Sequence, residues 1–333
     1  MEMYMIVGIF LAIVLVLLHL IRTYLSGAKC LLRQRLDGKV IVVTGCNTGI
    51  GLETVAELAR RGARVIMACR DLRKAEKSRA EILERYGVNN NQSTKLNLAS
   101  ENLESSIKPV TKEQLICESL DLASVPSIKN FAERLLQNET AIHMLINNAG
   151  VMVSDFQLTE YGFEKNMGVN HLGHFLLTHL LLPRLCSASG AKVINVSSDS
   201  HYFSRINIRD LNKPLRGSYY AHSKLAMVIH ARELSRRYAD QGLVAVSLHP
   251  GLTSTELFRQ PTILNYLIRT IVFPFIKTPW DGAQTTLLCA LSPKLIPGGY
   301  YRNCAPCQPN KQALDDTVCE CVWGVSEKLV VDS

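Results

Sequence analysis

The sequence predicts an α/β fold in which one doubly wound parallel sheet follows an N-terminal transmembrane helix. Short β-branched runs alternate with amphipathic segments through residues 38–328, as expected when helices connect parallel strands. The first of these runs ends in a glycine-rich turn, and a long apolar run occupies the N-terminus. No Pro/Gly/Ser-rich linker divides the 333 residues, so we expect one folded domain behind the anchor.

The N-terminal anchor is expected within residues 1–25. The run from Met5 to Ile21 is almost entirely apolar, and as a helix it is long enough to cross the hydrocarbon core. Glu2 precedes this run without a basic residue, which disfavours a secretory signal peptide. Basic residues follow in a linker, 26–37, so the positive-inside rule places the domain in the cytosol. The endoplasmic reticulum is the default membrane, and a buried helix is the alternative.

A glycine-rich turn follows the first expected strand, residues 39–44. The turn opens an amphipathic helix, 52–61, and this order of strand, turn and helix is the setting of a Rossmann-type dinucleotide site. Glycines let the backbone approach the pyrophosphate, and the helix N-terminus attracts its charge. We therefore predict cofactor contacts at Gly45, Asn47, Thr48, Gly49, Ile50 and Gly51.

The residue after the second expected strand, 63–69, indicates which cofactor is bound. An acidic side chain at this position would hold the ribose hydroxyls of NAD, whereas an arginine suits the 2′-phosphate of NADP. The sequence has Arg70 here, nineteen residues after Gly51. Asp71 is adjacent, but we expect it to cap the helix 72–86. Arg70 therefore predicts NADP.

Later strands also end in residues that could line the cofactor, because ligands of open α/β sheets lie at the carboxyl ends of the strands. The third strand is expected to run to residue 122, the fourth spans 142–146 and the sixth spans 243–248. The predicted contacts at these three strand ends are Asp121, Leu122, Asn148, Ala149, Gly150, Pro250, Gly251 and Thr253.

Tyr220 and Lys224 stand four residues apart at the start of an expected helix, so their side chains share one face. A phenol titrates near ~10 in water, and its use as an acid or base near neutral pH needs a cation beside it. Lys224 can be that cation. The spacing alone also fits an ordinary surface pair, so its meaning depends on the rest of the site.

Two further polar residues belong to this candidate site. Asn170 lies in an otherwise apolar helix, 169–178, where its amide must find partners. Ser198 ends the fifth strand at the same edge of the sheet, and no Gly-x-Ser-x-Gly turn suggests a nucleophile. We interpret the neighbouring His171 and His174 as core or surface polar residues rather than metal ligands.

Composition limits the other possible partners. The net charge of +8 is spread along the chain and fits an anionic cofactor or a membrane surface better than nucleic acid. The ten cysteines of a cytosolic domain are expected to be reduced. Cys304, Cys307, Cys319 and Cys321 resemble a split zinc site, but the second spacing is unusual and no His supports it, so we predict no metal.

Two segments interrupt the alternation of strands and helices. Residues from about 87 to 114 form a polar insertion, and residues from about 252 to 277 are rich in large apolar side chains. The apolar segment suits a cover over an apolar substrate, with an ordinary core segment as the alternative. Residues 329–333 are expected to be a tail.

Together these motifs resemble the short-chain dehydrogenase/reductase superfamily over about residues 38–328. Within it, the chain is most similar to the membrane-anchored retinol dehydrogenases. The polar insertion is longer than this family usually has, and the cysteine cluster is not one of its hallmarks. The second resemblance depends on the glycine turn, 44–51, and on residues 68–71, 169–178, 195–198, 222–226 and 249–251.

The resemblance implies a catalytic set. Ser198 would orient the substrate oxygen and Tyr220 would transfer the proton. Lys224 would lower the pKa of Tyr220 and hold the nicotinamide ribose, and Asn170 would support a water-linked proton relay.

The implied activity is NADP(H)-dependent interconversion of lipophilic alcohols and carbonyls, retinol and retinal first, with reduction by NADPH expected in cells. The alternatives are a steroid or other lipid carbonyl reductase and, from another class, a membrane-anchored nucleotide-binding scaffold without turnover. A homo-oligomer remains open.

Overall fold

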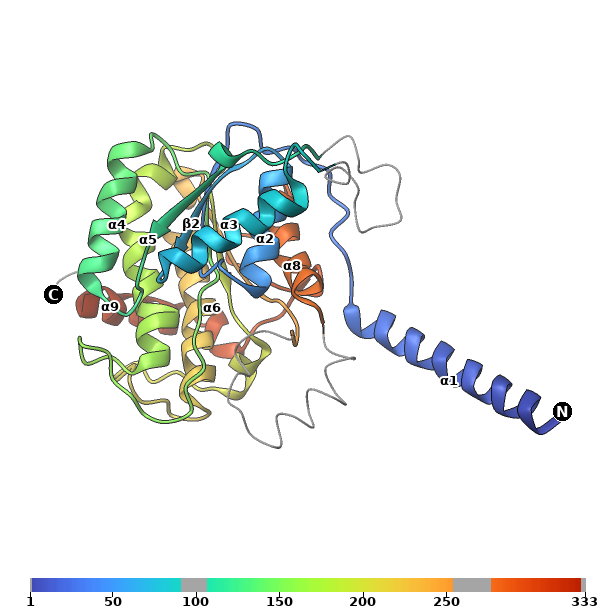
Figure 1. Cartoon of the computed structure of the whole chain (residues 1–333). Helices are drawn as coiled ribbons and strands as arrows, with labels where there is room; N and C mark the ends of the chain where they lie inside the picture. The colour runs from blue at the N-terminus through green and yellow to red at the C-terminus, as the bar shows by residue number, and fades with distance from the viewer. Residues whose placement is uncertain (1, 91–106, 254–276, 331–333) are drawn as a thin grey trace.

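A single eight-stranded sheet lies between two layers of helices in the computed structural model (Figure 1), which describes residues 2–90, 107–253 and 277–330. The strand order is β3-β2-β1-β4-β5-β6-β7-β8. Each neighbouring pair is parallel except β7 and β8, which are antiparallel. The predicted doubly wound parallel sheet is confirmed.

The strands form from short apolar runs that are covered on both faces, as parallel sheets require. Six correspond to predicted strands, but β3 ends at Ser119, so Asp121 and Leu122 follow the strand rather than ending it. β7 and β8 were not predicted, because they are short and lie around a turn rather than in an apolar run. The strands are β1 Val40–Thr44, β2 Arg64–Cys69, β3 Leu115–Ser119, β4 Met144–Asn147, β5 Lys192–Val196, β6 Val244–His249, β7 Tyr300–Arg302 and β8 Ala305–Cys307.

The helices divide between the two faces of the sheet. On one face are α2 Gly49–Arg60, α3 Leu72–Tyr86 and α8 Pro279–Leu291. On the other are α4 Val125–Asn138, α5 Gly173–Cys186 and α6 Tyr219–Arg237, with α9 Asp316–Val330 against α5 and α6. A π-helical turn, Met167–Leu172, precedes α5, and a 3₁₀ turn, Asp199–Phe203, follows β5.

Alternate residues of the central strands supply the two halves of the core. Val42 of β1 belongs to the buried cluster beneath α4, α5 and α6, whereas Ile41 and Val43 belong to the cluster beneath α2, α3 and α8. This alternation follows from the two-residue period of a strand. On the first side, the rings of Phe175 and Trp323 meet edge to face with centroids 4.8 Å apart.

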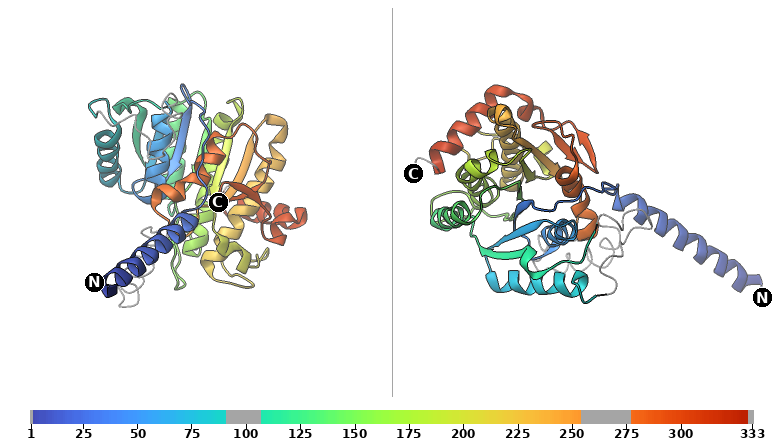
Figure 2. Two further views of the ribbon diagram at one scale, coloured as in Figure 1. Left: turned by 90° about the vertical axis from the view of Figure 1, so that its right-hand side faces the viewer. Right: turned by 90° about the horizontal axis from the view of Figure 1, so that it is seen from above.

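The N-terminal helix α1, Glu2–Ser26, projects away from this body in each view (Figures 1 and 2). Large apolar side chains along it are exposed, among them Ile9, Phe10, Ile13 and Leu17. Across the described residues, no helix combines the length and the apolar character that a membrane crossing needs.

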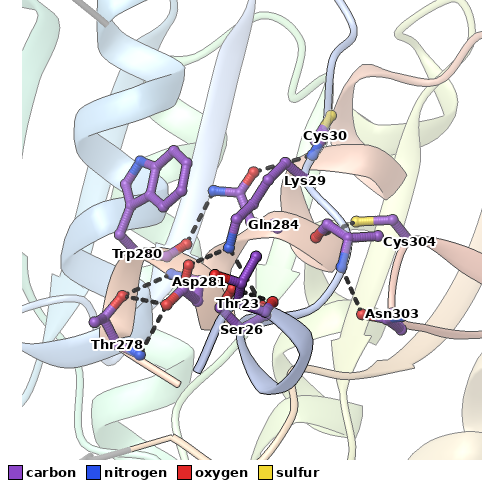
Figure 3. Close-up of polar contacts among 11 residues, drawn as sticks. Thr23, Ser26, Lys29, Cys30, Thr278, Trp280, Asp281, Gln284, Asn303 and Cys304 are labelled. Atoms are coloured by element: carbon purple, nitrogen blue, oxygen red, sulfur yellow. Dashed lines mark hydrogen bonds and ion pairs between the residues drawn. The ribbon is translucent and has the colours of Figure 1, made fainter. Parts of the chain in front are cut away.

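The predicted basic linker, 26–37, is held against α8 (Figure 3). Lys29 forms an ion pair with Asp281 in the first turn of that helix. The backbone N–H of Cys30 donates to Gln284 Oε1 at 3.0 Å. Lys29, one of the basic residues from which the orientation is predicted, is therefore paired within the protein.

Three predicted segments lie largely outside the described residues. Of the polar insertion, 91–106 are not described; its ends meet in an isolated bridge between Gly87 and Val110. Residues 254–276 of the apolar segment and 331–333 of the tail also lie outside.

The ten cysteines are all free. Cys307 is exposed on β8, whereas Cys319 is buried in α9. The described residues contain no cluster of three or more His, Cys, Asp or Glu side chains arranged to hold a metal ion.

Candidate active site

The glycine turn between β1 and α2 requires glycine for two reasons. Gly45 and Gly49 both have a φ of +62°, in the left-handed region that favours glycine. The turn that follows β4 also comes very close. A Cβ on Gly45 would lie 2.7 Å from the Cα of Ala149, and one on Gly51 would lie 2.6 Å from Asn148 Nδ2. The glycines of this turn therefore leave its backbone surface uncovered by side chains of their own.

The N-terminus of α2 is open toward this surface. Thr48 is the N-cap residue, yet its side chain makes no capping hydrogen bond, and the first turn carries no acidic residue. The first N–H groups of a helix lack intrahelical partners and carry partial positive charge. They are suited to a phosphate group, so the turn fits the pyrophosphate of a dinucleotide.

The β4 turn is joined to the glycine turn through Thr44. Its hydroxyl accepts the backbone N–H groups of Asn148 and Ala149, each at 3.0 Å. The Asn148 amide donates to two carbonyl oxygens at the end of β1, at 2.9 and 3.0 Å. On the other side, a Cβ on Gly150 would lie 3.3 Å from Lys224 Nζ. Predicted cofactor residues and a predicted catalytic residue thus meet at one edge of the sheet.

Ser218 starts α6 by accepting the N–H three residues further on, and this places Tyr220 and Lys224 in the first two turns. The ammonium of Lys224 lies 5.6 Å from the centroid of the Tyr220 ring and donates to the carbonyl of Val196 at 2.8 Å. The hydroxyl of Ser198 lies beside the Tyr220 phenol and lowers the pKa of that phenol. The structure therefore brings Ser198, Tyr220 and Lys224 together.

Asn170 lies in the π-helical turn before α5, and its side chain finds the partners that its apolar helix demanded. Its Oδ1 accepts the N–H of Val151 at 2.8 Å, and its Nδ2 donates to the carbonyl of Val151 at 3.0 Å. The same Nδ2 donates to Ser223 Oγ at 2.9 Å, and that hydroxyl donates to the carbonyl of Tyr220 at 2.8 Å. Asn170 is thus connected to the backbone of Tyr220.

Burial shifts the proton affinities of this set. Lys224 is only 4% exposed, and desolvation lowers its pKa to about 8. Desolvation raises the pKa of Tyr220, and the hydroxyl of Ser198 opposes this increase. The net shift for Tyr220 is upward, opposite to the lowering that the resemblance implies. The ammonium of Lys224 is directed at a carbonyl rather than at the phenol oxygen.

The other predicted cofactor residues lie at the same edge of the sheet, and each has a different environment. Ile50 and Thr253 converge on Gly282 of α8, where a Cβ would lie 2.9 Å from Ile50 Cγ1 and 2.4 Å from Thr253 Cγ2. Gly251, which follows Pro250, has a φ of +97°. Arg70 is exposed after β2.

Four of the residues singled out from the sequence, in the glycine turn and after β2 and β3, make local contacts within the fold. The side chain of Asp71 accepts the N–H of Lys74 and caps α3, as predicted. Asp121 Oδ1 accepts an N–H two residues further on, within the turn before α4. Leu122 is buried in the core, and the carbonyl of Asn47 accepts the hydroxyl of a serine in α3.

Sequence reasoning missed several residues that hold the site together. Thr44 and Ser223 appeared only as parts of motifs, although both make the hydrogen bonds given above. His174 contacts both Thr44 and Asn170. Its position four residues after Asn170, on the same helix face, was the available signal.

An open glycine turn beside a phenol, an ammonium and a serine hydroxyl defines the site of a dinucleotide-dependent oxidoreductase acting on alcohols and carbonyls. The family model for short chain dehydrogenases matches residues 39–102 and 86–262. The chain belongs to that family.

Named relatives cover nearly the whole chain. Human retinol dehydrogenase 12 is 42% identical over 315 residues, which is 93% of this chain and 92% of that protein. Bovine retinol dehydrogenase 12 is 41% identical over 96% of this chain and 95% of that protein. Human retinol dehydrogenase 11 is 40% identical over 92% of this chain and 90% of that protein.

Solved structures share the fold. A putative uncharacterized protein from Mycobacterium paratuberculosis superposes with a TM-score of 0.66 at 32% identity, covering 89% of this chain and 95% of that one. A short-chain type dehydrogenase/reductase from Mycobacterium marinum gives a TM-score of 0.60 at 18% identity, over 80% and 94% of the two chains.

Replacing Lys224 with Met should stabilise the protein while abolishing carbonyl turnover. The lowered pKa means that below about pH 8 the folded protein holds a buried charge that the unfolded chain holds in water. Each pKa unit corresponds to about 1.4 kcal/mol, so we expect Lys224→Met to be about 1–3 kcal/mol more stable at pH 7.

The advantage of Lys224→Met should shrink as the pH rises above 8, because the folded wild type then loses this proton before the unfolded chain does. Urea denaturation of both proteins between pH 7 and 10 measures the difference. A wild type that is more stable than the variant at every pH would contradict the prediction.

Proposed function

We propose that this protein is an NADP(H)-dependent oxidoreductase that interconverts lipophilic alcohols and carbonyls, with retinol and retinal as its principal pair. The observation that carries the proposal is the convergence of Asn170, Ser198, Tyr220 and Lys224 beside the open glycine turn. Reduction by NADPH is the direction that we expect in cells.

The chain's own residues account for positioning and proton supply. When bound, the nicotinamide group supplies or accepts the hydride. Ser198 and Tyr220 lie beside each other and can present two hydroxyls to a substrate oxygen. Because burial raises the pKa of Tyr220, the phenol is protonated near neutral pH and can donate its proton to a developing alkoxide. Lys224 can stabilise the phenolate that remains.

Apolar side chains beside Tyr220 support a lipophilic substrate. The ring of Tyr219 meets that of Phe156 with centroids 5.6 Å apart, and half of Phe156 is exposed. Met152, in the same loop after β4, is also exposed. The names of the relatives point to retinoids among lipophilic substrates. We also propose that residues 252–277 form an apolar cover over this substrate.

We expect NADPH to be preferred over NADH, with Arg70 as the cause. Arg70 is exposed after β2, while Asp71 is used in capping α3. A hydrogen bond to a charged group contributes about 1.5–3 kcal/mol, so Arg70→Gln should weaken NADPH binding by about 10- to 100-fold and leave NADH binding unchanged. Titration of cofactor fluorescence measures both affinities.

Arg73→Gln is the matched control for Arg70→Gln, because Arg73 is also an exposed arginine and lies in the first turn of α3. We expect it to change NADPH affinity less than threefold. Equal affinities of the wild type for NADPH and NADH would refute the role of Arg70.

Among carbonyl substrates, we expect all-trans-retinal to be reduced with the highest kcat/KM. Membrane preparations of the full-length protein, supplied with NADPH, would be compared on retinal, a sterol ketone and a medium-chain aldehyde. Faster reduction of the sterol ketone, without turnover of retinal, would instead support the steroid or lipid carbonyl reductase.

Tyr220→Phe distinguishes an enzyme from a nucleotide-binding scaffold. It removes one hydroxyl, and loss of a general acid slows a reaction by about 10²–10⁴-fold. Cofactor affinity should stay within threefold of the wild type. A wild type that binds NADPH but turns over no carbonyl would favour the scaffold.

We also propose that residues 1–25 attach the enzyme to a membrane, with the domain in the cytosol and the endoplasmic reticulum as the site. Support comes from the apolar side chains that α1 exposes away from the body. Full-length protein expressed in cells should stay in the membrane fraction after alkaline carbonate extraction, and a form without residues 1–25 should be released. Release of both forms would exclude an inserted anchor.

A further inference from the structure

We propose that His174 is a positioning residue that couples the cofactor-binding turns to the catalytic Asn170. The inference rests on the proposed function, because it concerns the same site. His174 is the first-turn residue of α5, and its side chain is fully buried between the end of β1 and the π-helical turn. It touches neither the reacting atoms nor an exposed surface. Any effect of His174 on the reaction would therefore act through Thr44 and Asn170.

Both ring nitrogens of His174 have hydrogen-bond partners that belong to the site. Nε2 lies 2.8 Å from Thr44 Oγ1, and Nδ1 lies 2.8 Å from the backbone carbonyl oxygen of Asn170. Thr44 is the last residue of β1, directly before the glycine turn. One imidazole therefore spans the gap between the cofactor side and the proton-transfer side.

The partners determine which nitrogen carries the proton. The carbonyl oxygen of Asn170 can only accept, so Nδ1 must be the donor. Nε2 is then an acceptor and takes the hydroxyl proton of Thr44. That assignment is consistent, because Thr44 Oγ1 already accepts two backbone N–H groups, from Asn148 and Ala149. The hydrogen bonds run in one direction, from the β4 turn through Thr44 and His174 to Asn170.

This arrangement requires a neutral imidazole, since a protonated ring could not accept from Thr44. Desolvation, opposed by the hydrogen bond to the Asn170 carbonyl and aided by the charge of Lys224, lowers the pKa of His174 to about 3. The ring therefore stays neutral over the whole range in which the enzyme would work.

The geometry explains why a histidine is needed at this point. Asn170 lies in a π-helical turn, and such turns are uncommon and occur frequently at functional sites. The side chain of Asn170 reaches the backbone of Tyr220 through Ser223. Movement of the Asn170 backbone would therefore be transmitted to the phenol, and His174 links that backbone to the strand before the glycine turn.

The decisive variant is His174→Phe in the full-length protein, because phenylalanine keeps a buried ring but removes both hydrogen bonds. Two buried partners are left unsatisfied, and such groups cost enough to shift a rate or an affinity by about 10- to 100-fold. We expect kcat to fall by about this factor, NADPH binding to weaken by at least fivefold, and KM for the carbonyl to change less than threefold.

Two conservative variants each keep one of the two hydrogen bonds of His174 and remove the other. The amide of His174→Asn can reach the position of Nδ1 and donate to Asn170, so it should recover most of kcat but not the NADPH affinity. The amide of His174→Gln can reach the position of Nε2 and bond to Thr44, so it should recover the NADPH affinity but not kcat. A residue that only filled space would show no such split.

His171→Phe is the matched control. His171 is also fully buried and lies on the adjacent turn, but its Nε2 is directed at Ser326 Oγ of α9, 2.8 Å away and outside the site. We expect this variant to lower thermal stability and to leave kcat and NADPH affinity within twofold.

Two results would overturn the inference: wild-type kcat and NADPH affinity in a folded His174→Phe protein, or an equal loss of both in His171→Phe. If His174→Phe does not fold, the Asn and Gln variants decide, and equal kinetics in both would also overturn it.

Cofactor binding is measured without a substrate. A wild type that binds NADPH and turns over a carbonyl, with unchanged His174 variants, refutes the coupling alone, whereas a wild type that binds neither NADPH nor NADH refutes the proposed function.

Discussion

The close approach of two turns is the constraint on which the rest of the site depends. Asn148 and Ala149 of the turn after β4 approach the glycine turn so closely that positions 45 and 51 have no room for a side chain. Adjacent parallel strands bring both turns to the same edge, and the hydroxyl of Thr44 holds them together. Glycine at positions 45 and 51 is therefore a condition for this contact.

A second constraint is burial, which gives the proton-transfer groups their properties. Lys224 would hold its proton more firmly in water, and Tyr220 would release its proton more readily. In the protein the pKa of Lys224 falls and that of Tyr220 rises, so the two pKa values move apart, because both charged forms are desolvated. The phenol is consequently kept protonated, as the proposed reduction requires, and the ammonium is a charge that the fold holds at a cost in stability.

The sequence was sufficient for the parts that depend on local pattern. Apolar runs identified six strands, and the Asp71 cap and the Tyr220 and Lys224 spacing followed from helix geometry. β7 and β8 were not predicted, because their pairing depends on a turn with positive φ at Asn303 and Cys304 rather than on an apolar run. Partners distant in the sequence, such as Thr44 with His174, become neighbours only through the fold and have no periodic signal.

A network of hydrogen-bonded polar side chains is buried beneath the candidate site. Asn147 and Asn195 are paired across β4 and β5, and the amide of Asn147 donates to Asn195 Oδ1 at 2.8 Å. Asn195 in turn donates to the carbonyl of Met227 in α6, which also carries Tyr220. Buried polar groups favour one arrangement when their partners are present and are costly when they are not. The network thus makes the register of β4 and β5 and the position of α6 mutually dependent, so the hydrogen bonds of these amides also help to position the helix that carries the phenol.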